Sequence, residues 1–277
     1  METHWQERTL DCGGTPRQVR VYAPASPVSA PERPKAPPAI VLHLHGGTFT
    51  CGDFDCSVAI CRSLAAAGAT VVSLDYPLAP EHPFPAALNV SYAALELLHR
   101  QRATWAGRGA RLFVAGEEAG ANIATALTLM ARDQHHPPIA GQILISPMLD
   151  PCLGTGSVRA AGVGEAGCRW ADGWHLYLGS ADKAAHPYAA PLGSRRLGGI
   201  PPALIVTSDT CPMRDESVAY GRRLAECGVQ VAAHVVREDG APVTPGTDLP
   251  LWARDLTSLF TAFLAGGCVP AAATIQA

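Results

Sequence analysis

The sequence predicts an α/β fold in which a mainly parallel central sheet is flanked by helices. Short apolar runs of strand length alternate with longer amphipathic segments along most of the chain, which is typical of a parallel sheet covered on both faces. The 277 residues suffice for one large α/β domain with a substantial core. Because 48% of the residues are hydrophobic and 16% are charged, we expect a packed globule rather than a disordered chain.

The strands and helices can be placed in order from their apolar patterns. Eight short apolar segments are predicted as strands: 7–12, 17–23, the run AIVLHL from residue 39, 70–76, 111–116, 140–146, 202–208 and 229–236. Five amphipathic segments are predicted as helices: 55–67, 86–101, 119–132, 215–227 and 249–264. The third strand runs directly into a glycine turn at Gly46 and Gly47.

Two segments interrupt this alternation. SPVSAPERPKAPP (26–38) is rich in proline and is predicted as an exposed loop. Residues 150–182 are predicted to be irregular and contain Trp170, Trp174 and Tyr177. We expect this stretch to form a small cap-like insertion above the carboxyl ends of the strands, where open α/β sheets bind ligands. The sequence contains no internal repeat, so we expect residues 1–277 to form a single domain.

Charge and hydropathy exclude several classes of function. A net charge of −3 gives no electrostatic reason to bind nucleic acid or an anionic membrane. No uninterrupted apolar run is long enough to span a bilayer, and the first residues, METHWQERTL, lack the apolar core of a signal peptide. We therefore expect a soluble, cytoplasmic protein.

Cysteine usage agrees with that expectation. The number of cysteines is odd, and no C-x-x-C pair occurs among the nine, at positions 12, 51, 56, 61, 152, 168, 211, 227 and 268. A disulfide framework or a structural zinc site is not indicated. We expect reduced thiols and neither a metal nor another cofactor.

Three motifs carry a specific resemblance. HLHGGTFTCGD (43–53) is similar to an HGGG oxyanion loop, LDYPLAPEHPFPAAL (74–88) to a DYRLAPEHPFPAAL segment, and VAGEEAGAN (114–122) to a GDSAGGN nucleophile elbow. In this order they resemble the hormone-sensitive-lipase-like esterases, and weaker similarity spans about residues 15 to 265. The resemblance implies an α/β-hydrolase fold with an esterase-type cleft. The helices that cap this cleft in the family before the first strand have no counterpart here, so we expect a reduced cap.

The resemblance also locates the three positions of a Ser-Asp-His triad. The elbow reads Gly116-Glu117-Glu118-Ala119-Gly120, so Glu118 stands at the position of the nucleophilic serine. Cys211 aligns with the acid, and Asp209 is a possible substitute two residues earlier. Hydrolysis by this fold needs a hydroxyl, a base and an orienting carboxylate together.

The catalytic histidine is missing by position as well. The family motif aligns Val243 with it, and the chain contains no histidine after His234, which is itself part of a predicted strand. With all three roles changed, we do not expect ordinary serine-esterase turnover.

The parts that bind an oxyanion are retained. By resemblance, Gly46, Gly47 and the backbone N–H of Ala119 form the oxyanion hole. Glu118 begins a predicted helix, whose N-terminus favours a negative charge, so its carboxylate is expected to occupy the hole as an internal ligand. His45, Trp170 and Trp174 are candidate ligand-binding residues, although His45 usually shapes the loop and the tryptophans can equally pack within the cap. Glu117 is expected to face solvent or to pair locally.

Three hypotheses remain open on this basis. The first is a pseudo-esterase whose cleft binds a small apolar or acyl-type ligand or a protein partner, as the plant gibberellin receptors of this fold use theirs for ligand sensing. The second is a non-canonical hydrolase, lyase or cyclase in which Glu118 is a carboxylate nucleophile or a general acid or base. The third is an interaction protein that forms a homodimer or pairs with an active homologue, for example through the final helix.

Overall fold

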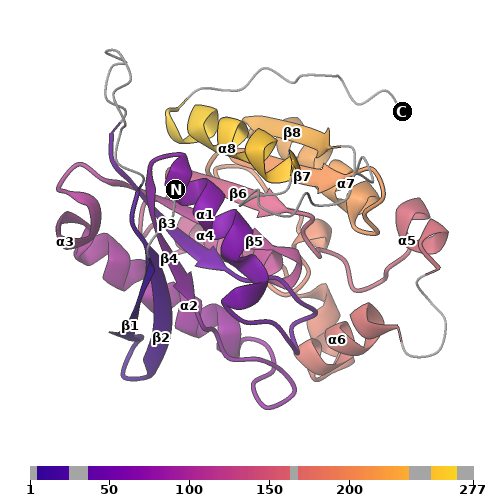
Figure 1. Cartoon of the computed structure of the whole chain (residues 1–277). Helices are drawn as coiled ribbons and strands as arrows, with labels where there is room; N and C mark the ends of the chain where they lie inside the picture. Colours follow the sequence, from indigo (N-terminus) through magenta and orange to yellow (C-terminus); the bar gives the residue numbers. More distant parts are fainter. Residues whose placement is uncertain (1–4, 25–36, 163–167, 237–250, 267–277) are drawn as a thin grey trace.

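The fold is built on one sheet of eight strands. The computed structural model describes residues 5–24, 37–162, 168–236 and 251–266 (Figure 1). Its strands are β1 (Trp5–Asp11), β2 (Pro16–Tyr22), β3 (Ala39–Leu44), β4 (Ala69–Leu74), β5 (Arg111–Glu117), β6 (Gly141–Ile145), β7 (Ala203–Ser208) and β8 (Val231–Val236). Their order across the sheet is β1-β2-β4-β3-β5-β6-β7-β8. Every predicted strand is therefore confirmed, to within a few residues.

Strand direction separates an antiparallel edge from a parallel centre. β1 pairs with β2, and β2 with β4, in the antiparallel sense. From β4 through β8 all neighbours are parallel. β3 and β4 are buried at every residue, as expected of parallel strands that are covered on both faces.

Helices cover both faces of the sheet. The α-helices are α1 (Val58–Ala66), α2 (Ala86–Arg100), α3 (Arg102–Ala106), α4 (Glu118–Asp133), α5 (Gly156–Ala160), α6 (Arg169–Leu178), α7 (Arg214–Glu226) and α8 (Leu251–Leu264). One core cluster packs α1 and α8 on one face, and a larger cluster packs α2, α4, α6 and α7 on the other. None of the helices in the described ranges is both long and apolar enough to cross a bilayer.

The prediction for residues 150–182 was wrong in one respect. This stretch contains α5 and α6, with a short 3₁₀ segment starting at Ala181, rather than only irregular chain (Figure 1). Trp174, Tyr177 and Leu178 recur at helical spacing on α6 and are all buried. Burial of this apolar stripe against Phe49 and its neighbours stabilises a helix that local sequence does not mark strongly. Of the proline-rich loop 26–38, residues 26–36 lie outside the described part of the chain.

Candidate functional site

A cavity of about 780 Å³ opens at the carboxyl ends of the parallel strands. Its volume is in the range of small-molecule sites in proteins. Its described walls come from the turn after β3, the junction of β5 and α4, the ends of β6 and β7, and Arg169 at the start of α6. Open α/β sheets bind their ligands outside the carboxyl ends of their strands. We therefore take this cavity as the candidate site.

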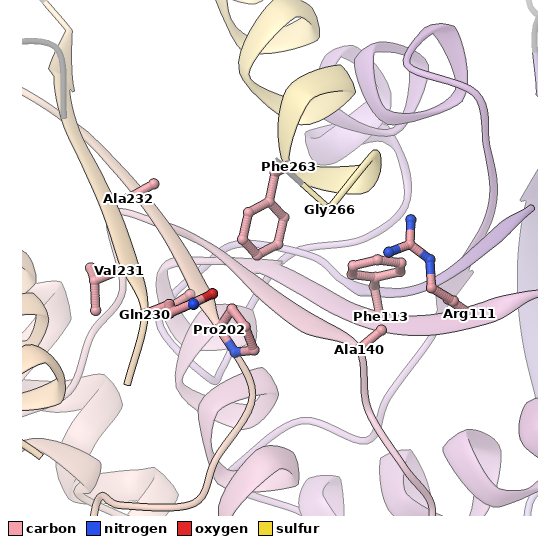
Figure 2. A pocket seen from close by; sticks show the side chains of 10 residues that line it. Arg111, Phe113, Ala140, Pro202, Gln230, Val231, Ala232, Phe263 and Gly266 are labelled. Atoms are coloured by element: carbon pink, nitrogen blue, oxygen red, sulfur yellow. The ribbon is translucent and has the colours of Figure 1, made fainter. Parts of the chain in front are cut away.

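A second cavity lies at the other side of the sheet, near the amino ends of the strands. It measures about 60 Å³ and is bounded by Arg111 and Phe113 of β5, the residues that begin β7 and β8, and Phe263 of α8 (Figure 2). A space of this size holds at most a few water molecules. It is a packing defect between α8 and the amino ends of the strands rather than a ligand site.

Glu118 occupies the turn between β5 and α4. Its φ of 45° lies in the left-handed region, which non-glycine residues seldom adopt and which is typical of a strained elbow. Its carbonyl accepts the N–H of Met148 at 3.1 Å. The turn therefore presents the Glu118 side chain to the cavity, which that side chain helps to line.

The Glu118 carboxylate reaches the loop after β3. Its Oε2 accepts a hydrogen bond from the N–H of Gly47 at 2.9 Å. A Cβ on Gly47 would lie 2.2 Å from the carbonyl oxygen of Cys51, and Gly47 has a φ of 130°, so only glycine fits here. The N–H that the resemblance assigns to an oxyanion is thus bound by a side chain of the same protein.

The other two residues expected in the oxyanion hole, Gly46 and Ala119, do not bind Glu118 in the way that Gly47 does. The N–H of Ala119 donates to the Gly47 carbonyl at 3.3 Å, so it does not point into an open hole and this assignment needs correction. The physical reason is the conformation of the loop, which turns the Gly47 carbonyl towards the start of α4. Gly46 lines the cavity, and a Cβ on it would lie 3.6 Å from Glu118 Oε2.

The protonation of Glu118 depends on four surrounding influences. Burial raises its pKa above the ordinary value for a carboxyl, and the nearby charge of Glu117 raises it further. The Gly47 N–H and the positive charge of Arg169 act in the opposite direction. The net direction is upward, so this carboxyl holds a proton to higher pH than an exposed glutamic acid does.

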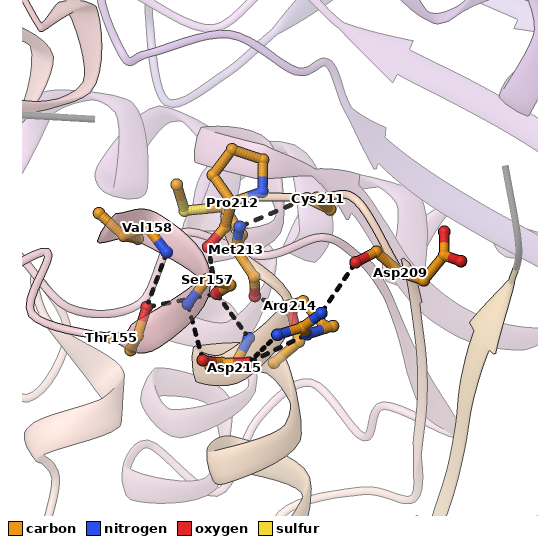
Figure 3. Close-up of polar contacts among 10 residues, drawn as sticks. Thr155, Ser157, Val158, Asp209, Cys211, Pro212, Met213, Arg214 and Asp215 are labelled. Atoms are coloured by element: carbon orange, nitrogen blue, oxygen red, sulfur yellow. Dashed lines mark hydrogen bonds and ion pairs between the residues drawn. The ribbon is translucent and has the colours of Figure 1, made fainter. Parts of the chain in front are cut away.

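Cys211 lies where the sequence places the acid position, on the wall of the cavity. Its Sγ accepts the N–H of Met213 at 3.4 Å (Figure 3). Asp209 is exposed, and in Figure 3 its carboxyl group points away from this turn. It does not belong to the described cavity lining. Its backbone carbonyl accepts a hydrogen bond from the Arg214 guanidinium at 2.9 Å. The structure therefore brings Cys211, but not the Asp209 carboxylate, to the site. Val243 lies outside the described residues.

The turn after Cys211 makes several hydrogen bonds to α5 and to the loop after β6. Asp215 accepts the N–H of Ser157 at 2.8 Å, and the Ser157 hydroxyl donates to the Pro212 carbonyl at 2.7 Å (Figure 3). Glu216, which is buried, accepts the N–H groups of Leu149 and Asp150 with one oxygen, each at 3.0 Å. These bonds tie α5 and the loop after β6 to the start of α7.

Glu216 makes stability depend on pH. Burial raises its pKa from 4.5 to about 8, although the two N–H donors oppose this shift. Between these values the folded chain binds more protons at this site than the unfolded chain, so stability falls as pH rises. We expect the free energy of unfolding to fall from pH 5 to pH 8.5 by on the order of 2 kcal/mol more in wild type than in Glu216→Gln. Urea unfolding at both pH values measures this difference, and parallel losses in the two proteins would contradict it.

His45 does not contact the cavity, which corrects its assignment as a ligand-binding residue. It is fully buried, its Nδ1 donates to the Gly46 carbonyl at 2.8 Å, and its ring stacks on Tyr76 at 4.2 Å between centroids. The Tyr76 hydroxyl donates to the His45 carbonyl at 2.9 Å. Burial lowers the pKa of His45, so it is neutral and shapes the loop.

Trp170 and Trp174 are also absent from the described cavity lining. Trp174 is 2% exposed and packs against Phe49 at 4.8 Å, because the hydrophobic effect turns the apolar face of α6 into the core. Trp170 is partly buried against the same core, and the Arg169 guanidinium lies 4.5 Å from its ring centroid. Of the described residues of α6, Arg169 thus contributes a cation to the cavity lining, and the two tryptophans do not line it.

Sequence reasoning missed the pairing of Glu117. The expectation that Glu117 faces solvent or pairs locally was wrong, because it lines the cavity and its Oε1 lies 3.2 Å from His43 Nε2 on β3. The other ring nitrogen of His43 lies 3.0 Å from the Ser73 hydroxyl on β4. The one available signal was a histidine inside an otherwise apolar, fully buried strand.

Known proteins resemble this chain over most of its length. A family described as the alpha/beta hydrolase fold matches residues 41–240. The esterase LipI of Mycobacterium tuberculosis is 36% identical over 236 residues, which are 81% of this chain and 70% of LipI. The carboxylesterase NlhH of the same species is 35% identical over 243 residues, 83% of this chain and 72% of NlhH. A thermostable esterase from Pseudomonas putida ECU1011 superimposes with a TM-score of 0.80 and 27% identity, covering 96% of this chain and 83% of its own.

Proposed function

Because this chain belongs to the hormone-sensitive-lipase-like carboxylesterases of the α/β-hydrolase fold, we propose that it keeps their cleft for binding but does not carry out their serine-dependent hydrolysis. In this proposal Glu118, Cys211 and Val243 stand at the serine, acid and histidine positions. The cleft binds a small ligand with an apolar or acyl-type body. Relatives such as LipI and NlhH are named as esterases, so the proposal concerns a change within an esterase family.

One contact carries this proposal. The hydrogen bond of 2.9 Å from the Gly47 N–H to Glu118 Oε2 places a carboxylate oxygen where an acyl-transfer enzyme stabilises its oxyanion. An ester carbonyl cannot use that donor unless Glu118 moves away. A carboxyl group in place of a serine hydroxyl also provides no nucleophile that the usual triad can activate.

The cavity wall supports a ligand with an apolar body. Ile145, Val206, Val236 and Leu256 supply apolar surface, and Glu117, Glu118 and Arg169 are among the polar groups that line the same cavity. Ligand sites commonly combine a mostly apolar wall with a few orienting polar groups.

An ester-hydrolysis assay tests the proposal. We expect the purified protein to hydrolyse p-nitrophenyl acetate and butyrate no faster than a heat-denatured sample of the same protein. LipI or NlhH, assayed in parallel, controls for the substrates. Saturable turnover by wild type that Glu118→Ala abolishes would overturn the proposal and favour a second candidate.

That second candidate is an enzyme in which Glu118 acts as a general acid or base. The observation that favours it is a carboxyl on the wall of an accessible cavity, with a pKa raised by burial. A carboxyl in this state can donate a proton at higher pH than an exposed glutamic acid does. The same Glu118→Ala comparison, run with non-ester carbonyl substrates, separates it from the binding function.

A further inference from the structure

Helix α6 packs tightly against the loop that follows β3. Gly173 of α6 is buried, and a Cβ placed on it would lie 2.1 Å from the carbonyl oxygen of Thr48 and 2.8 Å from the Thr48 Cβ. A side chain therefore does not fit at position 173 unless α6 or the loop moves. Thr48 directly follows Gly47, so this contact fixes the loop one residue away from the N–H that binds Glu118.

The same helix supports a strained residue of that loop. Phe49 has a φ of 68°, in the left-handed region that a bulky residue adopts only where its surroundings impose it. Its ring stacks on that of Tyr177, with 3.9 Å between the centroids and 9° between the planes, and lies 4.8 Å from the ring of Trp174. All three side chains are buried. Without α6 beside it, the loop would lose the contacts that offset the strain at Phe49.

Helix α6 also begins at the cavity. Its first residue, Arg169, lines the cavity wall together with Glu118. The positive charge of Arg169 and the Gly47 N–H lower the pKa of Glu118. Burial and the negative charge of Glu117 act in the opposite direction. The first of the two lowering groups lies on α6 and the second on the loop that α6 holds, so both depend on the position of this helix.

We propose that α6 holds the Glu118 side chain on the Gly47 N–H, with Gly173 as a positioning residue that fixes the loop and Arg169 as one that acts through its charge. While α6 is docked, the N–H is bound by Glu118. When α6 is displaced, the loop relaxes, this hydrogen bond is lost and the N–H becomes available to the carbonyl group of a ligand. The inference goes beyond the proposed function, because it concerns the element that controls this donor and not what the cleft binds.

Crowding at position 173 tests the contact. In Gly173→Ala the new methyl group pushes α6 away from Thr48. We therefore expect the amide hydrogen of Gly47 to exchange with solvent about tenfold faster than in wild type, the effect of losing one hydrogen bond to a carboxyl group. In wild type the NMR shift of this amide should follow the titration of the Glu118 carboxyl, and in the variant it should not.

Two further variants separate this effect from a general loss of stability. In Gly141→Ala the new methyl group would lie 2.8 Å from the ring of Phe263, at the amino end of β6, so this variant is equally crowded but should leave exchange at Gly47 as in wild type. Tyr177→Leu removes the ring that stacks on Phe49 without crowding the loop. It should speed up exchange at Gly47 in the same way as Gly173→Ala.

The contribution of charge is measured separately. In protein labelled with ¹³C at the glutamate carboxyl carbons, Arg169→Gln should raise the pH at which Glu118 titrates, because a positive charge is removed from the cavity wall. Arg222→Gln, at an exposed position of α7, is the matched control and should leave this midpoint unchanged. Circular dichroism verifies that each variant is folded.

The outcomes decide the role of α6 independently of the proposed function. Exchange at Gly47 that stays at the wild-type rate in Gly173→Ala, or that is accelerated equally in Gly141→Ala, would overturn the inference, as would a carboxyl midpoint that Arg169→Gln does not raise. If Gly173→Ala does not fold, Tyr177→Leu decides by the same exchange measurement. Hydrolysis of p-nitrophenyl butyrate by wild type would instead overturn the proposed function, and it would leave these exchange rates and midpoints as they are.

Discussion

Replacement of Glu118 by serine is expected to leave the protein without esterase activity, whereas replacement of all three proposed triad positions is expected to create it. In Glu118→Ser the carboxylate leaves the Gly47 N–H and a hydroxyl returns to the elbow. Under the proposed function the triad base is missing, because Val243 is proposed to stand at the histidine position. Activity on p-nitrophenyl butyrate should therefore remain at the level of the heat-denatured control.

The triple variant Glu118→Ser, Cys211→Asp and Val243→His supplies hydroxyl, base and orienting carboxylate together. Because triad members act as a unit, we expect its kcat to exceed that of the single variant by on the order of 10³-fold. The variant with Cys211→Asp and Val243→His but with Glu118 retained is the matched control and should stay inactive. Brisk hydrolysis by Glu118→Ser alone would show that another residue of this chain acts as the base.

Substitution of Gly120 by alanine is expected to cause a large loss of stability. A Cβ at this position of α4 would lie 2.2 Å from the Leu44 carbonyl oxygen and 2.3 Å from that of His45. Both are backbone atoms at the end of β3, so neither can rotate away, and α4 would have to shift off the sheet. We expect the free energy of unfolding to fall by about 4 kcal/mol, at the upper end of overpacking effects. Urea unfolding monitored by circular dichroism measures it.

Gly221→Ala is the matched control, since Gly221 also lies within a helix, α7. A Cβ there would lie 3.3 Å from Cδ1 of Ile205, the mobile end of a side chain. Alanine is the better helix former by about 1 kcal/mol, so this variant should be neutral or slightly stabilised. A Gly120→Ala protein as stable as Gly221→Ala would mean that α4 packs less closely on β3 than the structure has it.

The elements of the fold were predictable where the local pattern is strong. The buried runs that became β3 to β7 and the amphipathic stripes of α2 and α4 have the periods of their structures, and their predicted bounds agree with the observed ones to within a few residues. α6 was not predicted, because a helix this short depends on tertiary packing, and here Trp174, Tyr177 and Leu178 are buried in the core beside Phe49. Local propensity does not contain that contact.

Which residue types stand at the elbow follows from the amino-acid sequence alone, and so does the expectation that Glu118 lies at the start of a helix beside two retained loop glycines. These are local facts, because a motif and a helix start extend over only a few residues. The hydrogen bond of Glu118 to Gly47, 71 positions away, and the pairing of Glu117 with His43, 74 positions away, depend instead on how the strands are arranged in the sheet. Parallel strands join residues that are distant along the chain, and the partner of a buried polar group is set by which strands lie side by side.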